Sequence, residues 1–117
     1  RQMCIRDRVV QAYLKDPYCG HGFSVSAFHD LYMLTTAMHQ VSNYRDVNET
    51  LPILMIRGSE DPCTGYEKGA KDSVDTLKQA GFSNISTITY PHMRHEILNE
   101  KENEKVYADV IAFYEKT

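Results

Sequence analysis

Long apolar runs are absent from this chain of 117 residues. No stretch approaches the ~20 apolar residues that a membrane-spanning helix needs. An excess of positive charge is also absent, because the formal net charge is −3 and the charges are scattered, so we expect no nucleic-acid partner. Internal repeats and low-complexity segments are missing as well, and no repeat architecture is indicated.

Cysteine is sparse. The three cysteines form no CxxC pair and no metal-ligand spacing, so they predict neither a disulfide framework nor a metal site. Cys19 and Cys63 indicate a reducing compartment, which favours a cytoplasmic protein. We expect no cofactor.

The composition that remains is typical of a soluble globular domain, with 42% hydrophobic and 25% charged residues. A chain of this length is enough for one small domain. The densest charge cluster, residues 100–105, predicts a solvated helix face. Composition therefore bounds the class of protein and leaves its activity open.

The first half of the chain reads as two helices joined by a loop. Val9 to Leu14 is typical of the end of a helix, and Asp16 before Pro17 ends it, because a residue before proline avoids the α region. Ser24 or Ser26 can cap the next helix, whose larger residues recur at steps of three and four: Phe28, Leu31, Tyr32, Thr35 and Met38. Residues 43–50 are polar and indicate a loop.

The second half alternates strands and helices. Residues 51–57 predict a strand buried on both faces, residues 66–80 a helix ended by Gly81, and residues 85–90 a second strand. Asn99 as N-cap and Glu102 suggest a capping box for the last helix. Its packing face would be Val106, Val110, Phe113 and Tyr114. This order predicts an α/β fold with a parallel sheet.

Asp61 follows the first strand, and His95 follows the second. Because the carboxyl ends of parallel strands open onto one crevice, we expect these side chains to meet there. Histidine is suited to be a general base near neutral pH, and a buried carboxylate can orient its ring and stabilise its charged form. We predict Asp61 and His95 as catalytic residues, although alone each is typical of ordinary turn or loop chemistry.

Two neighbours compete for these roles. Glu60 is the alternative acid and His92 the alternative base. Arg94 and Glu96 can brace the histidine loop by a salt bridge or a hydrogen bond, and a solvated loop is equally compatible with the pattern.

Two further patterns fail on inspection. His95-Glu96-Ile97-Leu98-Asn99 begins like the HExxH helix of zinc proteases, but Asn99 replaces the second ligand, so we predict no metal site. Ser24 stands in a sequence similar to the G-x-S-x-G elbow of serine hydrolases, but Ser26 occupies the second glycine position and no strand precedes it. We interpret Ser24 as a helix cap.

Residues 1–8 have no apolar period, no helix cap and no secretory core. Their Met-Cys-Ile-Arg-Asp matches one reading frame of a transposase adapter used to build sequencing libraries. We interpret these eight residues as a translated cloning scar and expect the natural sequence to begin near Val9.

The rest of the chain resembles the C-terminal part of an α/β-hydrolase of the lysophospholipase, monoacylglycerol lipase and serine aminopeptidase-like group. Three phrases carry the resemblance: residues 16–20 (DPYCG), 52–62 (PILMIRGSEDP) and 90–100 (YPHMRHEILNE). It implies that 9–50 is the end of a cap region with the helix returning to the core, and that 51–117 is the C-terminal part of the core domain, the N-terminal part being missing. The family phrase ends in Asp-Pro, which selects Asp61 over Glu60.

The resemblance also implies a serine hydrolase of carboxylic esters that uses an acyl-enzyme route, with the nucleophile and the oxyanion hole outside this chain. An acyl ester of glycerol or a lysophospholipid is the expected substrate, and a peptide or small ester is the alternative. A non-catalytic binding protein of the same fold is the competing interpretation. We expect the fragment alone to be inactive and to fold marginally, because two strands leave an open sheet edge. The oligomeric state stays open.

Overall fold

The structure, a computed structural model, describes residues 7–116. Most of the eight residues that we interpret as a cloning scar lie outside this range, and that interpretation stays a prediction; Asp7 already belongs to a helix. The elements in chain order are α1 (Asp7–Lys15), α2 (Val25–His39), η2 (Val41–Asn43), β1 (Ile53–Gly58), α3 (Tyr66–Gln79), β2 (Ile85–Tyr90), η3 (Ile97–Asn99) and α4 (Asn103–Tyr114).

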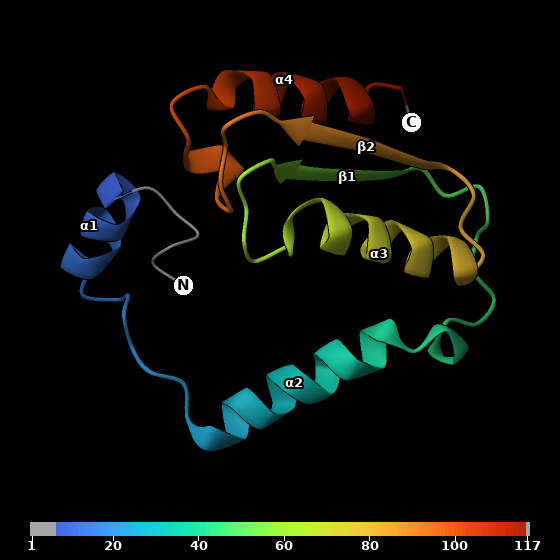
Figure 1. Ribbon diagram of the computed structural model, residues 1–117, viewed down its shortest axis with the longest axis horizontal. Helices are drawn as coiled ribbons and strands as arrows, with labels where there is room; N and C mark the ends of the chain where they lie inside the picture. The colour runs from blue at the N-terminus through green and yellow to red at the C-terminus, as the bar shows by residue number, and fades with distance from the viewer. Residues whose placement is uncertain (1–6, 117) are drawn as a thin grey trace.

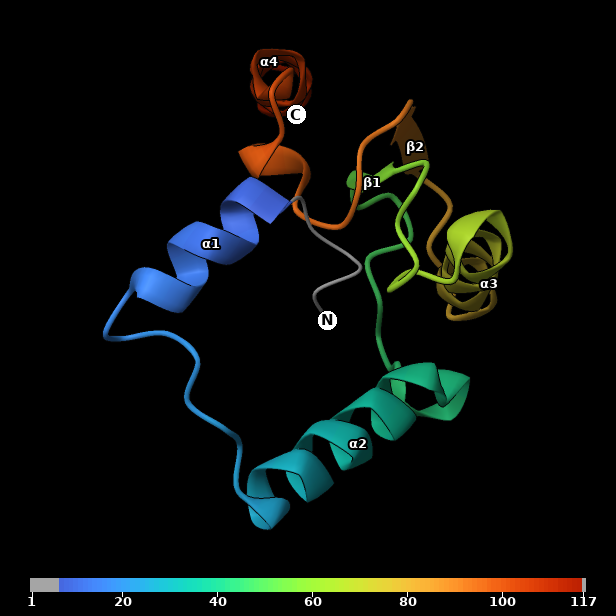
Figure 2. The ribbon, with the colours of Figure 1, turned by 60° about the vertical axis from the view of Figure 1, so that its left-hand side comes forward.

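The two strands pair in parallel, as predicted, in a register that runs from Ile53 opposite Ile85 to Gly58 opposite Tyr90. Figure 1 shows α3 and α4 on opposite sides of the strands, and Figure 2 shows the same layers from a second direction. Both strands therefore end at the same edge of the sheet, where the loops carrying Asp61 and His95 begin.

The core lies between the sheet and α4. Its buried members are Tyr90, Met93, Ile97 and Val106, with Ile56 and Ile88 of the strands packed against them. Tyr90 also donates a hydrogen bond from its hydroxyl to Oδ2 of Asp109 on α4, at 3.0 Å. A polar contact thus joins β2 to α4 beside the apolar ones.

Local signals predicted several boundaries correctly. α1 ends at Lys15, directly before Asp16-Pro17. α3 ends at Gln79, and Gly81 has a φ of 106°, a backbone conformation that glycine adopts without the cost borne by other residues. Pro52 stands just before β1, where its missing N–H is tolerated.

The prediction that residues 51–57 are buried on both faces is wrong. Leu51 is exposed, and the residues of β1 before Gly58 are only half-buried. The two-stranded sheet leaves one edge of β1 open, and a cavity of about 450 Å³ lies between the strands and α3, with Met55, Thr87 and Val74 in its lining. Full burial of β1 would require a strand on its other edge.

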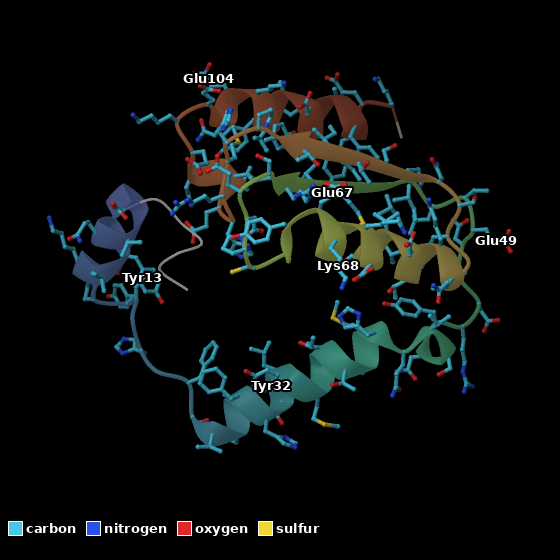
Figure 3. The ribbon with its side chains drawn as sticks, in the orientation of Figure 1. Tyr13, Tyr32, Glu49, Glu67, Lys68 and Glu104 are labelled. Carbon is cyan, nitrogen blue, oxygen red and sulfur yellow. The ribbon has the colours of Figure 1, made fainter. Side chains whose placement is uncertain are left out.

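Helix α2 lies apart from the strands and α3 along most of its length (Figure 1). Its apolar positions, including Phe28, Leu31 and Tyr32, stay exposed, and Figure 3 marks Tyr32 on this helix. Within residues 7–116, no helix combines the length and apolar character needed to cross a membrane.

The predicted start of the last helix is wrong. Asn99 closes the short 3-10 helix η3, and α4 begins four residues later with Glu102 as an N-cap that makes no side-chain capping bond. Glu100 interrupts the helical path, because its backbone is extended (ψ 164°) and its side chain turns inward. Because the Glu100 side chain is buried, the prediction that residues 100–105 form a fully solvated helix face is wrong for this residue.

The predicted packing face of α4 is correct in part. Val106 is fully buried, and Val110 and Phe113 are half-buried. Tyr114, the last residue of α4, is exposed, so its predicted place in the packing face is wrong.

Candidate active site

Asp61 is held in place by the turn that follows β1. Its side chain is 2% exposed, and Oδ1 accepts a hydrogen bond from the backbone N–H of Cys63 at 2.8 Å. Its backbone carbonyl accepts from the hydroxyl of Thr64 at 3.1 Å and from the amide of Tyr66 at 3.3 Å. A hydrogen bond from a backbone amide to the side chain of the aspartate two residues before it closes a local turn. Here the turn points the other carboxylate oxygen of Asp61, Oδ2, towards the loop that carries His95.

That second oxygen meets His95. Oδ2 of Asp61 lies 3.0 Å from Nδ1 of His95, 34 residues along the chain. Since a carboxylate can only accept, Nδ1 carries the proton and Nε2 is the nitrogen able to take one. The His95 side chain is 49% exposed, whereas that of Asp61 is buried. The pair has the arrangement of an oriented general base: a fixed buried acid and a ring that reaches solvent.

Glu60 and His92, the alternative acid and base of the sequence analysis, pair with each other. His92 Nδ1 lies 3.1 Å from Oε1 of Glu60, and the two side chains are 89% and 46% exposed. An exposed pair of this kind contributes little free energy, because solvent screens it. The structure thus separates the pair with a buried acid, Asp61 with His95, from the pair in which both side chains are exposed, Glu60 with His92.

Hydrogen bonds donated by backbone amides join the loop that carries Asp61 to the loop that carries His95. The Ser59 amide donates to the carbonyl of Tyr90, and the Glu60 amide donates to the carbonyl of Met93, each at 2.9 Å. The His92 amide donates to the hydroxyl of Ser59, also at 2.9 Å. These bonds fix the distance between the Asp61 and His95 loops independently of the side chains at the site.

Glu100 is a residue that the sequence interpretation missed. It is 7% exposed, and its Oε1 accepts a hydrogen bond from the backbone N–H of Arg94 at 2.9 Å. The loop that carries His95 is therefore braced from Glu100 to the Arg94 backbone, while Glu96 bonds to Asn99 at 3.0 Å. No local pattern marks Glu100 as buried, because it stands in a run of charged residues.

Gly58 was also missed. A Cβ added there would lie 2.2 Å from the carbonyl oxygen of Met93 and 2.5 Å from that of Arg94. Only glycine lets the end of β1 approach the histidine loop so closely. An isolated glycine at a strand end is a general sign of close backbone approach, so this residue could have been found from the sequence.

Of the other residues considered in the sequence, Ser24 lies away from the site and Cys63 lies within it. Ser24 is the N-cap of α2, as predicted, and its hydroxyl accepts from the amide of Ala27 at 3.2 Å. Cys63 belongs to the site, because its Sγ, a carboxylate oxygen of Asp61 and a ring nitrogen of His95 all lie within 4.8 Å of one another. Neither Cys19 nor Cys63 forms a disulfide.

Comparisons with known proteins show the family and the fold of the chain. Residues 1–102 match the family described as serine aminopeptidase, S33. The chain is 37% identical over 59 residues to acyl-protein thioesterase 1 of Gibberella zeae, an alignment that covers 50% of this chain and 24% of the thioesterase.

The fold is similar to the crystal structure of a highly thermostable carboxyl esterase from Bacillus coagulans in complex with glycerol. The TM-score is 0.81 at 23% identity, over 93% of this chain and 36% of the esterase. The chain thus spans about a quarter of the thioesterase and about a third of the esterase. It belongs to the serine aminopeptidase S33 family and has the α/β-hydrolase fold.

Proposed function

We propose that the whole protein is a serine hydrolase of carboxylic esters in which His95 is the general base and Asp61 orients it. The observation that carries this proposal is the bond between the buried Asp61 carboxylate and Nδ1 of the half-exposed His95, at the ends of two parallel strands. The family to which the chain belongs supports it. The nucleophile is then a serine on a part of the protein outside these 117 residues.

The proposed reaction has two halves. His95 takes the proton of the serine hydroxyl as the serine attacks the ester carbonyl, and then gives that proton to the leaving alcohol. In the second half, His95 takes a proton from water, which attacks the acyl-enzyme, and returns it to the serine. Asp61 keeps the ring in the tautomer with Nδ1 protonated and stabilises the imidazolium formed in both halves.

An acyl ester of glycerol or a lysophospholipid is our leading substrate class. The thioesterase relative supports a thioester, and the family description supports a peptide, as the alternatives within hydrolases. A panel of a monoacylglycerol, a lysophospholipid, a short ester, an acyl thioester and an aminoacyl amide, compared by kcat/KM, distinguishes these classes. Retention of both Asp61 and His95 favours an enzyme over a non-catalytic binding protein.

The deciding experiment uses the whole protein, read from its source locus across Val9, with short ester hydrolysis as the assay. His95→Gln should abolish hydrolysis, and Asp61→Asn should lower kcat by about 10⁴-fold, because the ring loses the partner that fixes its tautomer. His92→Gln and Glu60→Gln are matched controls from the exposed pair and should retain activity. Hydrolysis that survives His95→Gln, or is lost only in His92→Gln, would refute the assignment.

A further inference from the structure

We propose that Asp61, Cys63 and His95 form a binding site for a borderline-soft divalent cation of the Zn²⁺ type, and that this ion switches the site off. The binding is independent of the function proposed above; the inhibition rests on it. The site shares two residues with the catalytic pair and adds the thiol of Cys63, for which the hydrolytic mechanism has no use.

The geometry supplies three ligand atoms in one place. A carboxylate oxygen of Asp61, the Sγ of Cys63 and a ring nitrogen of His95 all lie within 4.8 Å of one another. Tetrahedral zinc, with bond lengths of about 2.0 to 2.3 Å, needs ligand atoms about 3.5 Å apart. A closure of at most about 1.3 Å between ligand atoms therefore converts the present arrangement into a coordination sphere.

Burial determines which ligands can make that adjustment. Asp61 is buried and anchored by the amide of Cys63, so it is the fixed ligand. Cys63 and His95 are exposed, and rotation of their side chains meets little packing resistance. The fixed carboxylate and the two adjustable side chains also leave the fourth position open to solvent.

The donor set selects the ion. One thiolate, one imidazole and one carboxylate suit Zn²⁺ and its analogue Co²⁺, whereas Mg²⁺ and Ca²⁺ prefer oxygen ligands only. Binding releases the thiol proton to solvent, and coordination through Nδ1 also moves the ring proton of His95 from Nδ1 to Nε2. No electron transfer or bond cleavage is involved, so the step is reversible by a chelator.

Metal binding and the general-base role exclude each other. Coordination through Nδ1 breaks the hydrogen bond to Asp61 and leaves the ring proton on Nε2, whereas coordination through Nε2 occupies the proton acceptor itself. Either mode leaves His95 unable to activate a nucleophile. The ion acts here as an inhibitor that competes with a proton, in contrast to the catalytic zinc that the HExxH-like pattern would have implied.

The test is a Co²⁺ titration of the whole protein under reducing conditions, with Zn²⁺ as the competitor and no substrate present. We expect one equivalent of Co²⁺ to produce thiolate-to-cobalt charge-transfer absorption that Zn²⁺ abolishes. Because Cys19 and cysteines elsewhere in the protein could contribute thiolates, a variant that keeps Cys63 as its only cysteine is the reference and should retain the band. Adding Cys63→Ser should remove it.

Histidine variants separate this site from non-specific binding. His95→Gln should weaken Co²⁺ binding by about tenfold or more, while His92→Gln, three residues away and exposed, should not. An unfolded chain would not distinguish these two histidines. A band that persists in Cys63→Ser, equal effects of the two histidine variants, or no band at all would overturn the proposal.

The whole protein then tests the inhibition. Zn²⁺ should lower the rate of ester hydrolysis, and Cys63→Ser should relieve that effect when each variant is compared with and without the ion. Absence of hydrolysis together with Co²⁺ binding would refute the proposed function alone. Hydrolysis that Zn²⁺ leaves unchanged would refute the inhibition.

Discussion

The backbone amide of Arg94 donates a hydrogen bond to the buried carboxylate of Glu100, 2.9 Å away, and so ties the loop that carries His95 to the segment that leads into α4. Arg94 directly precedes His95, so this contact positions the backbone from which the His95 side chain extends.

Glu100→Ala removes the acceptor from the Arg94 amide, which should cost about 1 to 3 kcal/mol and loosen the His95 loop. The readout specific to positioning is the downfield Nδ1 proton resonance of His95, which should broaden through faster exchange with water. Glu100→Gln retains an oxygen that can accept and should restore the signal. The exposed Glu102→Ala is the control, and broadening in that variant as well would argue against a specific role for Glu100.

Gly58→Ala should push the two loops apart, because the new Cβ would lie 2.2 Å from the Met93 carbonyl oxygen. Overpacking typically costs about 1 to 3 kcal/mol, and a clash with backbone belongs at the upper end. Urea denaturation measures the loss. Gly22→Ala is the matched control, because no atom lies within 4 Å of its added Cβ, and its stability should change by no more than about 1 kcal/mol. Equal midpoints for the two variants would contradict the close approach.

Burial and the hydrogen bond to Asp109 raise the pKa of Tyr90 to about 12, from its ordinary value of 10.0. The unfolded chain therefore releases this proton near pH 10, while the folded chain retains it. Tyr90 should stabilise the fold fully below pH 10 and progressively less as the pH rises to about 12.

Tyr90→Phe should abolish this part of the alkaline slope and, at neutral pH, cost about 1 kcal/mol for the lost bond to Asp109. Urea unfolding at a series of pH values between 9 and 12 checks both effects. Tyr18→Phe, at a residue 90% exposed, should leave the slope as it is. A slope that survives in Tyr90→Phe would show that other groups produce it.

Ser24→Ala should destabilise α2 by about 1 kcal/mol, because the Ala27 amide loses its cap. Since α2 is largely exposed, the effect should appear as faster amide exchange within α2, with exchange in the strands unchanged. Ser24→Asp keeps a capping oxygen and should restore protection. In the whole protein Ser24→Ala should leave ester hydrolysis intact; loss of hydrolysis would reopen Ser24 as the nucleophile.

Predictions from sequence succeeded where one or two neighbouring residues decide the structure. Asp16 before Pro17 ends α1, Ser24 caps α2, and the run of β-branched residues gives the bounds of β2 as predicted. These outcomes depend on sterics and hydrogen bonds within one turn of chain, so the local sequence contains the whole cause.

Predictions failed where a distant partner decides. Glu100 stands among exposed charges but turns inward to the Arg94 amide, and this contact moves the start of α4 beyond Asn99. β1 reads as a fully buried strand, yet its burial depends on what covers its second edge. Neither outcome is encoded within a window of a few residues.

The candidate site divides in the same way. The sequence by itself determined the α/β order, the placement of Asp61 and His95 after successive strands, and the order of acid and base along the chain, because strand propensity and turn chemistry are local. Only the tertiary structure decided that Asp61 meets His95 while Glu60 meets His92, that Glu100 braces the loop, and that Cys63 joins the pair. Those choices depend on burial and on distances across two loops, which exist only once the parallel strands have paired.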